Sequence, residues 1–448
     1  MLYPLSYRGG GAILRFSARI LQMEKYRHAP SGPTPSGPAP GGTAYNQGEP
    51  PGSGGGMKGK LPRTVLVLGL VSFFNDLASE MVVPLIPILL ATILGAGPLA
   101  LGLIEGVADA VAAFLKLWSG RHSDWLGGRR KGLTVAGYAL SNLARPLLGL
   151  AGSWPMVLLL RGVDRVGKGL RSAPRDALVA DSTPIGIRGF AYGYHRALDN
   201  GGAVGGSLVA AAVLAWWAVP LHQVILWSAL PGLMGVLLIV FGVREKAAAV
   251  APPRRAPLPP LRWGGLSGPM RRYLLVLALF TLARASETFI LLRGFELGVG
   301  TVQLLLLWAA LNLAKAVTST GGGRLADRLG KGVVILVSWT AFAASFLALG
   351  QAAHPALLWG VTVFYGLVAG LGEGAERALV SDFAGNAERG TAFGWYHLML
   401  GLAAIPGGAL FGAVWHFAGA AWAFSYAGIL GLAAAALMRL WVPPRPVV

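Results

Sequence analysis

The chain has 448 residues, of which 54% are hydrophobic and 13% charged, and it contains no cysteine. Apolar residues recur in blocks long enough to cross about 30 Å of hydrocarbon, which indicates a polytopic membrane protein. The lack of cysteine excludes disulfides and thiolate chemistry. A formal net charge of +19 is compatible with a nucleic-acid partner, but the positions of the basic residues argue against one.

The first part of the chain differs in composition from the rest. Residues 30–56 are rich in Pro, Gly and Ser, and we expect residues 1–56 to form a disordered leader. This leader lacks the apolar core and cleavage site of a secretory signal. Met57, directly before Lys58 and Lys60, is an alternative start.

Hydropathy predicts twelve membrane-spanning helices. In chain order they cover residues 64–92, 98–119, 132–150, 154–181, 188–215, 221–242, 272–295, 301–321, 332–351, 356–382, 390–416 and 420–441. The sequence therefore predicts an all-α membrane protein with a six-helix bundle in residues 57–242 and a second in residues 272–448. The basic, Pro-rich linker 243–271 between them is too polar to span.

Lys and Arg gather on alternate connections, such as 129–131, 244–272 and 324–331. The connections between them contain neither residue and lie near 95–98, 151–153, 216–222, 297–300, 352–356 and 417–420. Because basic loops stay in the cytoplasm, we expect both termini and the linker to be cytoplasmic. A bacterial inner (plasma) membrane is the expected location.

The fourth predicted helix is strongly charged. It carries Arg161, Asp164, Arg165, Lys168, Arg171, Arg175 and Asp176, which fall within an arc of roughly 140° at 3.6 residues per turn. Ionisable groups at membrane depth face protein or a water-filled cavity and suggest a solute or proton pathway. The excess of basic residues predicts an electropositive cavity for an anionic or zwitterionic solute, unless carboxylates of the first two helices balance it.

Several other predicted helices carry charged faces that must converge on the same interior. The candidate residues of a substrate or proton pathway are Asp76, Glu80, Glu105, Asp109, Arg161, Asp164, Arg165, Lys168, His195, Asp199, Arg284, Glu287 and Glu376. Two interpretations stay open: neutralising ion pairs, such as Asp164 with Arg161 or Lys168, or carboxylates that carry protons. Glu80 is the main candidate for proton exchange, with Asp76 one turn away on the same face.

The same residues give little sign of an enzyme or a cofactor site. No nucleophile, base and orienting group occur together at a plausible spacing. Gly167-Lys168-Gly169 lacks the preceding glycine of a phosphate-binding loop, which disfavours ATP-driven transport. His195 and His397 have no partners at metal-ligand spacing, so we expect neither a metal nor another cofactor.

The two halves repeat each other in sequence. RDALVADSTPIGIR (175–188) aligns without gaps to ERALVSDFAGNAER (376–389), and Glu80 matches Glu287, each after a serine. Halves of equal orientation, related by an axis along the membrane normal, are a transporter architecture with its substrate site between them.

Two further segments carry a resemblance to a known family. GRHSDWLGGRRK (120–131) and GRLADRLGK (323–331) resemble the G-x-L-A-D-R-x-G-R-K loop of the major facilitator superfamily, and the resemblance covers nearly everything from Met57 onward. It implies a cytoplasmic latch that stabilises the outward-facing state. The implied latch residues are Gly120, Asp124, Arg129, Arg130, Gly323, Asp327, Arg328 and Gly330. Trp125 replaces the usual Arg in the first copy, so Asp124 is expected to pair with Arg129 or Arg130.

The resemblance extends to the fourth and fifth helices. Arg161-x-x-x-Arg165 resembles the basic motif that the family associates with proton transfer, and the glycines of 201–206 resemble its antiporter motif, although Gly206 stands in place of Pro. Close helix packing is the alternative interpretation of these glycines.

The resemblance implies a secondary active transporter that works by alternating access. We expect proton-coupled export of small organic or amphipathic compounds. The alternatives are proton-coupled uptake of an anionic metabolite, or a receptor or scaffold that does not transport. The expected partners are the solute, protons and the lipid bilayer, with the protein a monomer and without nucleic acid.

Overall fold

The computed structural model describes residues 61–125, 130–184, 187–243, 262–383 and 389–442. The predicted leader 1–56 and residues 244–261 of the predicted linker lie outside these ranges. The predictions for those two segments therefore stay predictions.

The helices of the first half follow the six predicted segments. They are α2 (Arg63–Glu80) with η1 (Val83–Leu85) and α3 (Ile86–Thr92), α4 (Pro98–Trp125), α5 (Lys131–Leu147) with η2 (Leu148–Leu150), α6 (Trp154–Asp181), α7 (Arg188–Trp217), and α8 (Leu221–Trp227) with α9 (Ala229–Gly242). Each predicted segment thus corresponds to one helix or to a helix with a break.

The helices of the second half follow the other six segments. After η4 (Trp263–Gly265) come α10 (Gly268–Ala283), α11 (Thr288–Glu296), α12 (Thr301–Leu329), α13 (Lys331–Gly350), α14 (Pro355–Phe383), α15 (Arg389–Ala418) and α16 (Ala420–Trp441). The seventh predicted helix begins at Gly268 instead of 272, because the Ser267 hydroxyl accepts a hydrogen bond from the Met270 N–H (3.4 Å) and caps the first turn.

Ten helical segments of the described chain are long and apolar enough to cross a membrane. The two remaining predicted spans are α5, which has only 17 residues, and α6, whose charged residues lower its hydropathy. Both lie against other helices, since α5 packs on α6 and α6 on α4. Their polar groups therefore meet protein instead of lipid. The prediction of an all-α membrane protein is confirmed.

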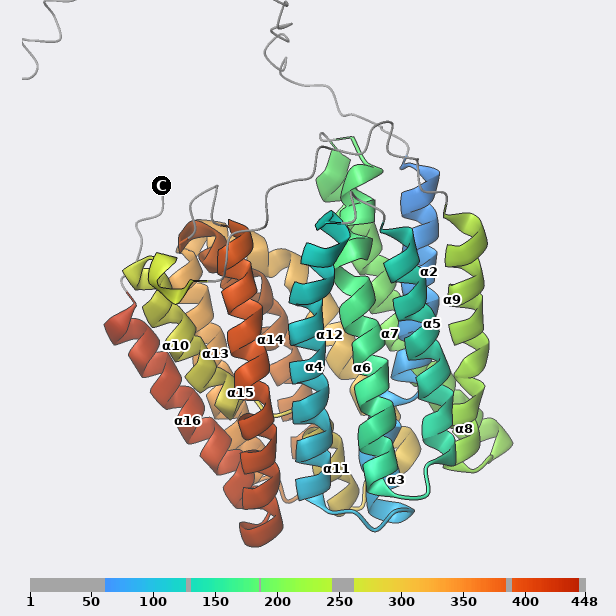
Figure 1. Cartoon of the computed structure of the whole chain (residues 1–448). Helices are drawn as coiled ribbons and strands as arrows, with labels where there is room; N and C mark the ends of the chain where they lie inside the picture. Colours follow the sequence, from blue (N-terminus) through green and yellow to red (C-terminus); the bar gives the residue numbers. More distant parts are fainter. Residues whose placement is uncertain (1–60, 126–129, 185–186, 244–261, 384–388, 443–448) are drawn as a thin grey trace, which may run out of the picture. The chain divides into compact units, whose positions relative to one another are not determined.

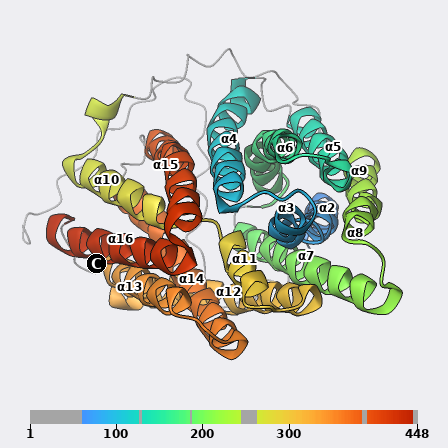
Figure 2. The same ribbon diagram turned by 90° about the horizontal axis from the view of Figure 1, so that it is seen from below.

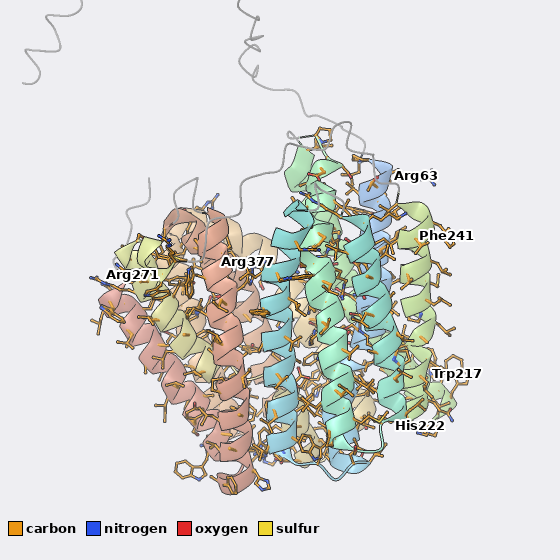
Figure 3. The ribbon with its side chains drawn as sticks, viewed as in Figure 1. Arg63, Trp217, His222, Phe241, Arg271 and Arg377 are labelled. Atoms are coloured by element: carbon orange, nitrogen blue, oxygen red, sulfur yellow. The ribbon has the colours of Figure 1, made fainter. Side chains whose placement is uncertain are left out.

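The helices form two groups that meet along two pairs of helices (Figures 1 and 2). Helix α4 of the first half packs against α15 of the second, and α12 packs against α7. Helices α4 and α12 both terminate at the same end of the bundle, which we call the motif end. We call the opposite end the far end. Figure 3 places Arg63 and Arg271 toward the motif end and Trp217 and His222 toward the far end.

The predicted loops at the motif end are partly wrong. Helix α4 continues to Trp125 and α12 to Leu329, so that Gly120, Asp124, Gly323, Asp327 and Arg328 all belong to helices. Charged residues end the apolar signal in a sequence, but they do not end the backbone hydrogen bonding of a helix. Helix α12 stops only at Gly330, whose positive φ of 90° is available to glycine at little cost.

The first helix of each half is interrupted beside a glutamate, which the hydropathy pattern did not predict. Helix α2 ends at Glu80, where Pro84 has no N–H to donate to the Glu80 carbonyl. Helix α11 begins directly after Glu287, and the Ser286 hydroxyl accepts a hydrogen bond from the Thr288 N–H (3.4 Å). The two glutamates that match in sequence therefore occupy equivalent helix breaks.

The glycines of the fifth predicted helix allow α7 to lie close to α2. A Cβ added at Gly202 or at Gly206 would lie 2.3 Å from the carbonyl oxygen of Phe73 or Leu77. Such a contact is impossible for a larger residue, so these positions require glycine. Close packing is thus a sufficient reason for this part of the resemblance.

Candidate functional site

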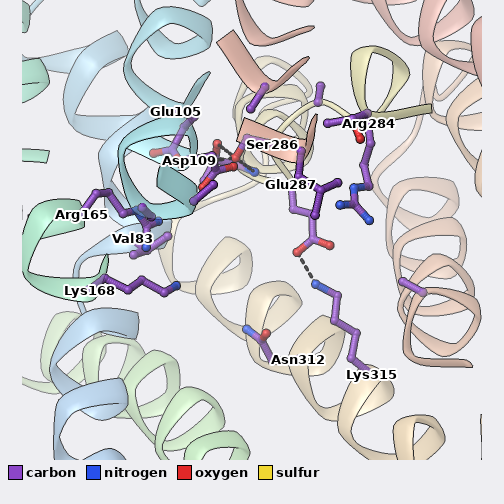
Figure 4. A pocket seen from close by; sticks show the side chains of 18 of the residues that line it. Val83, Glu105, Asp109, Arg165, Lys168, Arg284, Ser286, Glu287, Asn312 and Lys315 are labelled. Carbon is purple, nitrogen blue, oxygen red and sulfur yellow. Dashed lines mark hydrogen bonds and ion pairs between the residues drawn. The ribbon is translucent and has the colours of Figure 1, made fainter. Parts of the chain in front are cut away.

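A cavity of about 630 Å³ lies between the two halves and is lined by residues from both. Ten of the thirteen predicted pathway residues line it: Asp76, Glu80, Glu105, Asp109, Arg161, Arg165, Lys168, Arg284, Glu287 and Glu376. Figure 4 shows Arg165 and Lys168 on one side of the cavity and Arg284, Glu287 and Lys315 on the other. The charged faces predicted on separate helices do converge on one interior.

The other three predicted residues are not among the lining residues. Asp164 is fully buried. His195 lies 2.8 Å through its Nε2 from the Ser72 hydroxyl and 3.5 Å through its Nδ1 from Asp199 Oδ2. Asp164, His195 and Asp199 therefore lie in the helix packing behind the cavity wall.

A buried ion cluster joins α4, α5 and α6 next to the cavity. Arg161 donates to both carboxylate oxygens of Glu105, at 3.2 Å each, and its Nη1 lies 3.3 Å from Asp164 Oδ2. The Nε of Arg145 donates to the other Asp164 oxygen at 2.8 Å. Asp164 thus pairs with Arg161, as one interpretation predicted, but not with Lys168. Buried charges of this kind hold their geometry only while each is compensated.

Arg145 is a member of this cluster that the sequence reasoning missed. Its Nη1 donates to the carbonyl and side-chain oxygens of Asn75 and to Asn142 Oδ1, each at 3.0 Å. It therefore ties α2 and α6 to its own helix, α5. The available signal was a lone basic residue inside an otherwise apolar predicted helix.

Arg165 and Lys168 form no ion pair among the residues that the structure describes, although both lie near carboxylates of α2, α4 and α6. Arg165 is 8% exposed and lines the cavity one turn from Arg161. Within the described ranges, neither Arg165 nor Lys168 has a side-chain hydrogen bond or an ion pair, and the Arg165 Nε is buried without an acceptor. A buried guanidinium in this state is prepared to bind an anion.

Arg284 supplies a cation from the opposite wall. It lies at the end of α10, is exposed to the cavity, and places its guanidinium carbon 5.9 Å from the centre of the Phe280 ring. No ion pair of Arg284 is found among the described residues. Cations of this kind therefore line both halves of the cavity.

The carboxylates of the second half, in contrast, are each held by two described side chains. Glu287 forms an ion pair with Lys315 and accepts a hydrogen bond from the Tyr365 hydroxyl (2.8 Å). Glu376 accepts hydrogen bonds from Trp339 Nε1 (2.9 Å) and the Tyr396 hydroxyl (3.4 Å). Lys315 was also not predicted as a residue of the site. Like Arg145, it is a single charged residue within an apolar segment.

Glu80 is held differently from its counterpart in the second half. It accepts a hydrogen bond from Trp308 Nε1 (2.7 Å), which belongs to α12 of the other half. No Lys or Arg of the described chain lies within ion-pair distance of Glu80. A second contact between the halves links the Ser286 hydroxyl to Glu105 (3.5 Å). Glu80 is therefore a carboxylate whose partner depends on how the halves meet.

The cavity carries an excess of positive charge. Its lining residues include ten Lys and Arg and six Asp and Glu. The carboxylates of α2 and α4, which the sequence left as a possible balance, line it too but are too few to neutralise these basic residues. Because cavity walls of low dielectric focus the field of their charges, this excess attracts anions.

The implied latch residues are only partly within the described side chains. Arg130 forms an ion pair with Asp181 (2.6 Å), and Lys331 forms one with Asp382 (2.6 Å) at the equivalent place in the second half. Arg328 is exposed at the end of α12. Arg129 and the side chains of Asp124 and Asp327 lie outside the described part, so the pairing predicted for Asp124 stays a prediction.

Comparison with known proteins places these features in a family. The family model described as Major Facilitator Superfamily matches residues 68–312 and 273–448. An uncharacterized MFS-type transporter of Methanocaldococcus jannaschii is 29% identical over 362 residues, which cover 80% of this chain and 89% of the relative. An uncharacterized protein of Mycobacterium tuberculosis is 31% identical over 385 residues, covering 78% of this chain and 86% of its own length.

A solved structure shares the fold. The human organic anion transporter MFSD10 superposes with a TM-score of 0.62 at 20% sequence identity, over 84% of this chain and 99% of that chain. At this identity the likeness extends to the fold alone.

Proposed function

The chain belongs to the major facilitator superfamily and is a secondary transporter, and from this premise we propose that it carries a small organic anion by proton-coupled alternating access. The observation that supports the anion most directly is Arg165, a nearly buried guanidinium that lines the cavity and has neither a hydrogen bond nor an ion pair among the described residues. Lys168 beside it and Arg284 on the opposite wall extend the positive surface. An anion that enters the cavity supplies the negative charge that this surface needs.

The packing of the halves fits one stage of an alternating-access cycle. At the far end, α4 and α15 lie in backbone contact at Gly102 and Gly408. The cavity begins beyond this contact and extends along α4 from Glu105 to Lys116. With the motif end in the cytoplasm, as the loop charges predict, closure at the far end is the arrangement expected of an inward-facing conformation. The motif residues Asp124 and Asp327 would then stabilise the opposite, outward-facing conformation.

The direction of transport depends on how the solute is coupled to protons and not on the glycines of α7. Gly202 and Gly206 are required by their contacts with α2, so their likeness to an antiporter motif gives no argument for export. An anion that travels with protons down an inward pH gradient is taken up. The cavity charge supports the anionic solute of the uptake alternative, and coupling to protons that enter with it supplies the direction in our proposal.

The sign of the solute charge is the first expectation to test. Benzenesulfonate and phenyltrimethylammonium share a ring and carry opposite permanent charges. In calorimetric titrations of the purified protein in nanodiscs, we expect benzenesulfonate to bind more tightly. Arg165→Ala should weaken its binding by about 10-fold to 100-fold, since a hydrogen bond to a charged group contributes roughly 1.5–3 kcal/mol. Arg165→Lys should fall between, because it keeps the charge but loses the two-pronged geometry.

The matched control is Arg63→Ala, which removes an exposed arginine at the start of α2 that does not line the cavity. It should leave the affinity for benzenesulfonate unchanged. Tighter binding of phenyltrimethylammonium, undiminished in Arg165→Ala, would show that the acidic residues of α2 and α4 form the site and that the solute is a cation.

Proton coupling is expected to depend on Glu80. Glu80→Gln keeps an oxygen that accepts the Trp308 hydrogen bond but cannot ionise, so uptake of benzenesulfonate into proteoliposomes driven by a pH gradient should be lost. Exchange of benzenesulfonate across the membrane without a gradient should continue. Glu287→Gln is the comparison, because it breaks the ion pair with Lys315 and should impair exchange as well. Gradient-driven uptake by Glu80→Gln at the wild-type rate would remove Glu80 from the proton pathway.

A further inference from the structure

The two halves of the cavity are built on one plan but from different side chains. A shift of 201 residues relates the ion pair of Arg130 and Asp181 to that of Lys331 and Asp382. The same shift relates the aligned segments that begin at Arg175 and Glu376. Residues of α5 and α6 can therefore be compared one by one with those of α13 and α14.

This comparison shows that a polar cluster in the first half is replaced by an aromatic cluster in the second. Ser141 donates to the Asp164 carbonyl at 2.8 Å, and at the equivalent positions the rings of Phe342 and Tyr365 lie 6.1 Å apart. Arg145, which binds Asp164, corresponds to Phe346, whose ring lies 5.8 Å from that of Tyr365. The same pairs of positions are in contact in both halves, with opposite chemistry.

The aromatic cluster reaches the cavity. Its members among the lining residues are Phe280, Trp339, Phe342, Tyr365 and Tyr396. The rings of Phe280 and Trp339 are stacked, with centroids 4.1 Å apart and an interplanar angle of 5°, and Phe342 contacts Phe280 edge to face at 5.1 Å. This side of the cavity therefore presents ring carbons.

The carboxylates on that side already accept hydrogen bonds from the protein. Trp339 and Tyr396 donate to Glu376, and Tyr365 donates to Glu287, whose charge is also balanced by Lys315. The carboxylates of this wall are thus already held by protein donors, and its rings are the part left to contact a solute. Arg165 and Lys168 on the facing side are basic groups that form no ion pair with any described residue.

We propose that the transported solute is an aromatic anion whose charged group binds Arg165 and Lys168 and whose ring packs against the wall around Phe280 and Phe342. The proposal rests on the anion transport proposed above and adds the nature of the apolar part. Offset-stacked or edge-to-face contacts are the favoured geometries of a ring in such a wall. Arg284 lies beside the aromatic wall, over the Phe280 ring, and can stack on the ring of a solute in the same way.

The experiment compares two permanently ionised anions that differ only in their apolar part. Benzenesulfonate and methanesulfonate are titrated by calorimetry into the purified protein in nanodiscs. We expect benzenesulfonate to bind at least roughly tenfold more tightly, since the ring gains both apolar burial and aromatic contacts. Equal affinities would overturn the inference about the ring while leaving the proposed anion transport in place. If neither sulfonate binds and phenyltrimethylammonium does, the inference and the proposed function both fail.

A variant locates the ring within the cavity. Phe342→Leu keeps an apolar side chain, though a smaller one, and loses the aromatic ring, so it should weaken benzenesulfonate binding by a factor of about three to ten. Its affinity for methanesulfonate should stay at the wild-type value, which a general loss of structure would not allow. Phe417→Leu, at a position 81% exposed on α15, is the control and should change neither affinity. An equal loss for both ligands in Phe342→Leu would place the ring elsewhere and contradict the inference.

Discussion

Replacing Asp164 by alanine is expected to cause a large loss of thermal stability. Asp164 is fully buried and compensates Arg145 at 2.8 Å and Arg161 at 3.3 Å. The substitution leaves Arg145 without its carboxylate and Arg161 with Glu105 alone. Breaking a buried ion pair on one side costs about 3–5 kcal/mol, because a buried charge is left uncompensated. Thermal unfolding of the purified protein in detergent measures the loss.

Two further variants separate this effect from a general sensitivity to lost carboxylates. Asp109→Ala removes a carboxylate that is exposed to the cavity, and should change stability by no more than about 0.5 kcal/mol. The double variant Arg145→Met with Asp164→Leu removes both partners and leaves the contacts of Arg161 with Glu105, so most of the stability should return. If the double variant unfolds as early as Asp164→Ala, the cluster does not act through charge compensation.

This cluster also marks the limit of what helix faces can predict. Arg161 and Arg165 lie one turn apart on one face of α6, and the sequence grouped them. In the structure Arg161 forms ion pairs with Glu105 and Asp164, whereas Arg165 forms none in the described chain. Pairing depends on where α4 and α5 lie beside α6, which is a tertiary property. Helical periodicity reports only that a charge points inward.

The helices themselves can be predicted from the sequence, because each apolar block is long and bounded by polar connections. The hydropathy pattern does not predict the helix breaks at Glu80 and Glu287, although Pro84 is a local signal for the first break. The motif residues at the ends of α4 and α12 were assigned to loops, because a hydropathy pattern stops where charge begins. Arg145 and Lys315 were not predicted as site residues, because each is a single charged residue within an apolar helix. Such a residue does not form a charged helix face.

The second large effect is expected from a glycine in the contact between the halves. Gly102→Ala should shift the protein toward the conformation that is open at the far end. A Cβ at Gly102 would lie 2.1 Å from the Gly408 carbonyl oxygen, and one at Gly408 would lie 2.4 Å from the Gly102 carbonyl oxygen. These atoms are backbone and cannot rotate away, so α4 and α15 must separate. Overpacking of this kind costs about 1–3 kcal/mol.

The added methyl group raises the free energy of the conformation that is closed at the far end. It does not raise the free energy of a conformation in which the halves are separated at that end. The open population should therefore rise by about 5-fold to 150-fold. The chain has no cysteine, so spin labels on cysteines at Ile93 and Trp422, both exposed, report a single distance between the halves. Pulsed electron paramagnetic resonance should show a larger fraction of long distances in Gly102→Ala.

Gly360→Ala is the matched control, because a Cβ added at this position of α14 meets no atom within 4 Å. Alanine there should leave the distance distribution unchanged and the helix slightly more stable, since alanine has the higher helix propensity. A distribution in Gly102→Ala identical to that of wild type would mean that α4 and α15 absorb the added methyl group by local bending. The contact at Gly102 and Gly408 would then have no part in closing the far end.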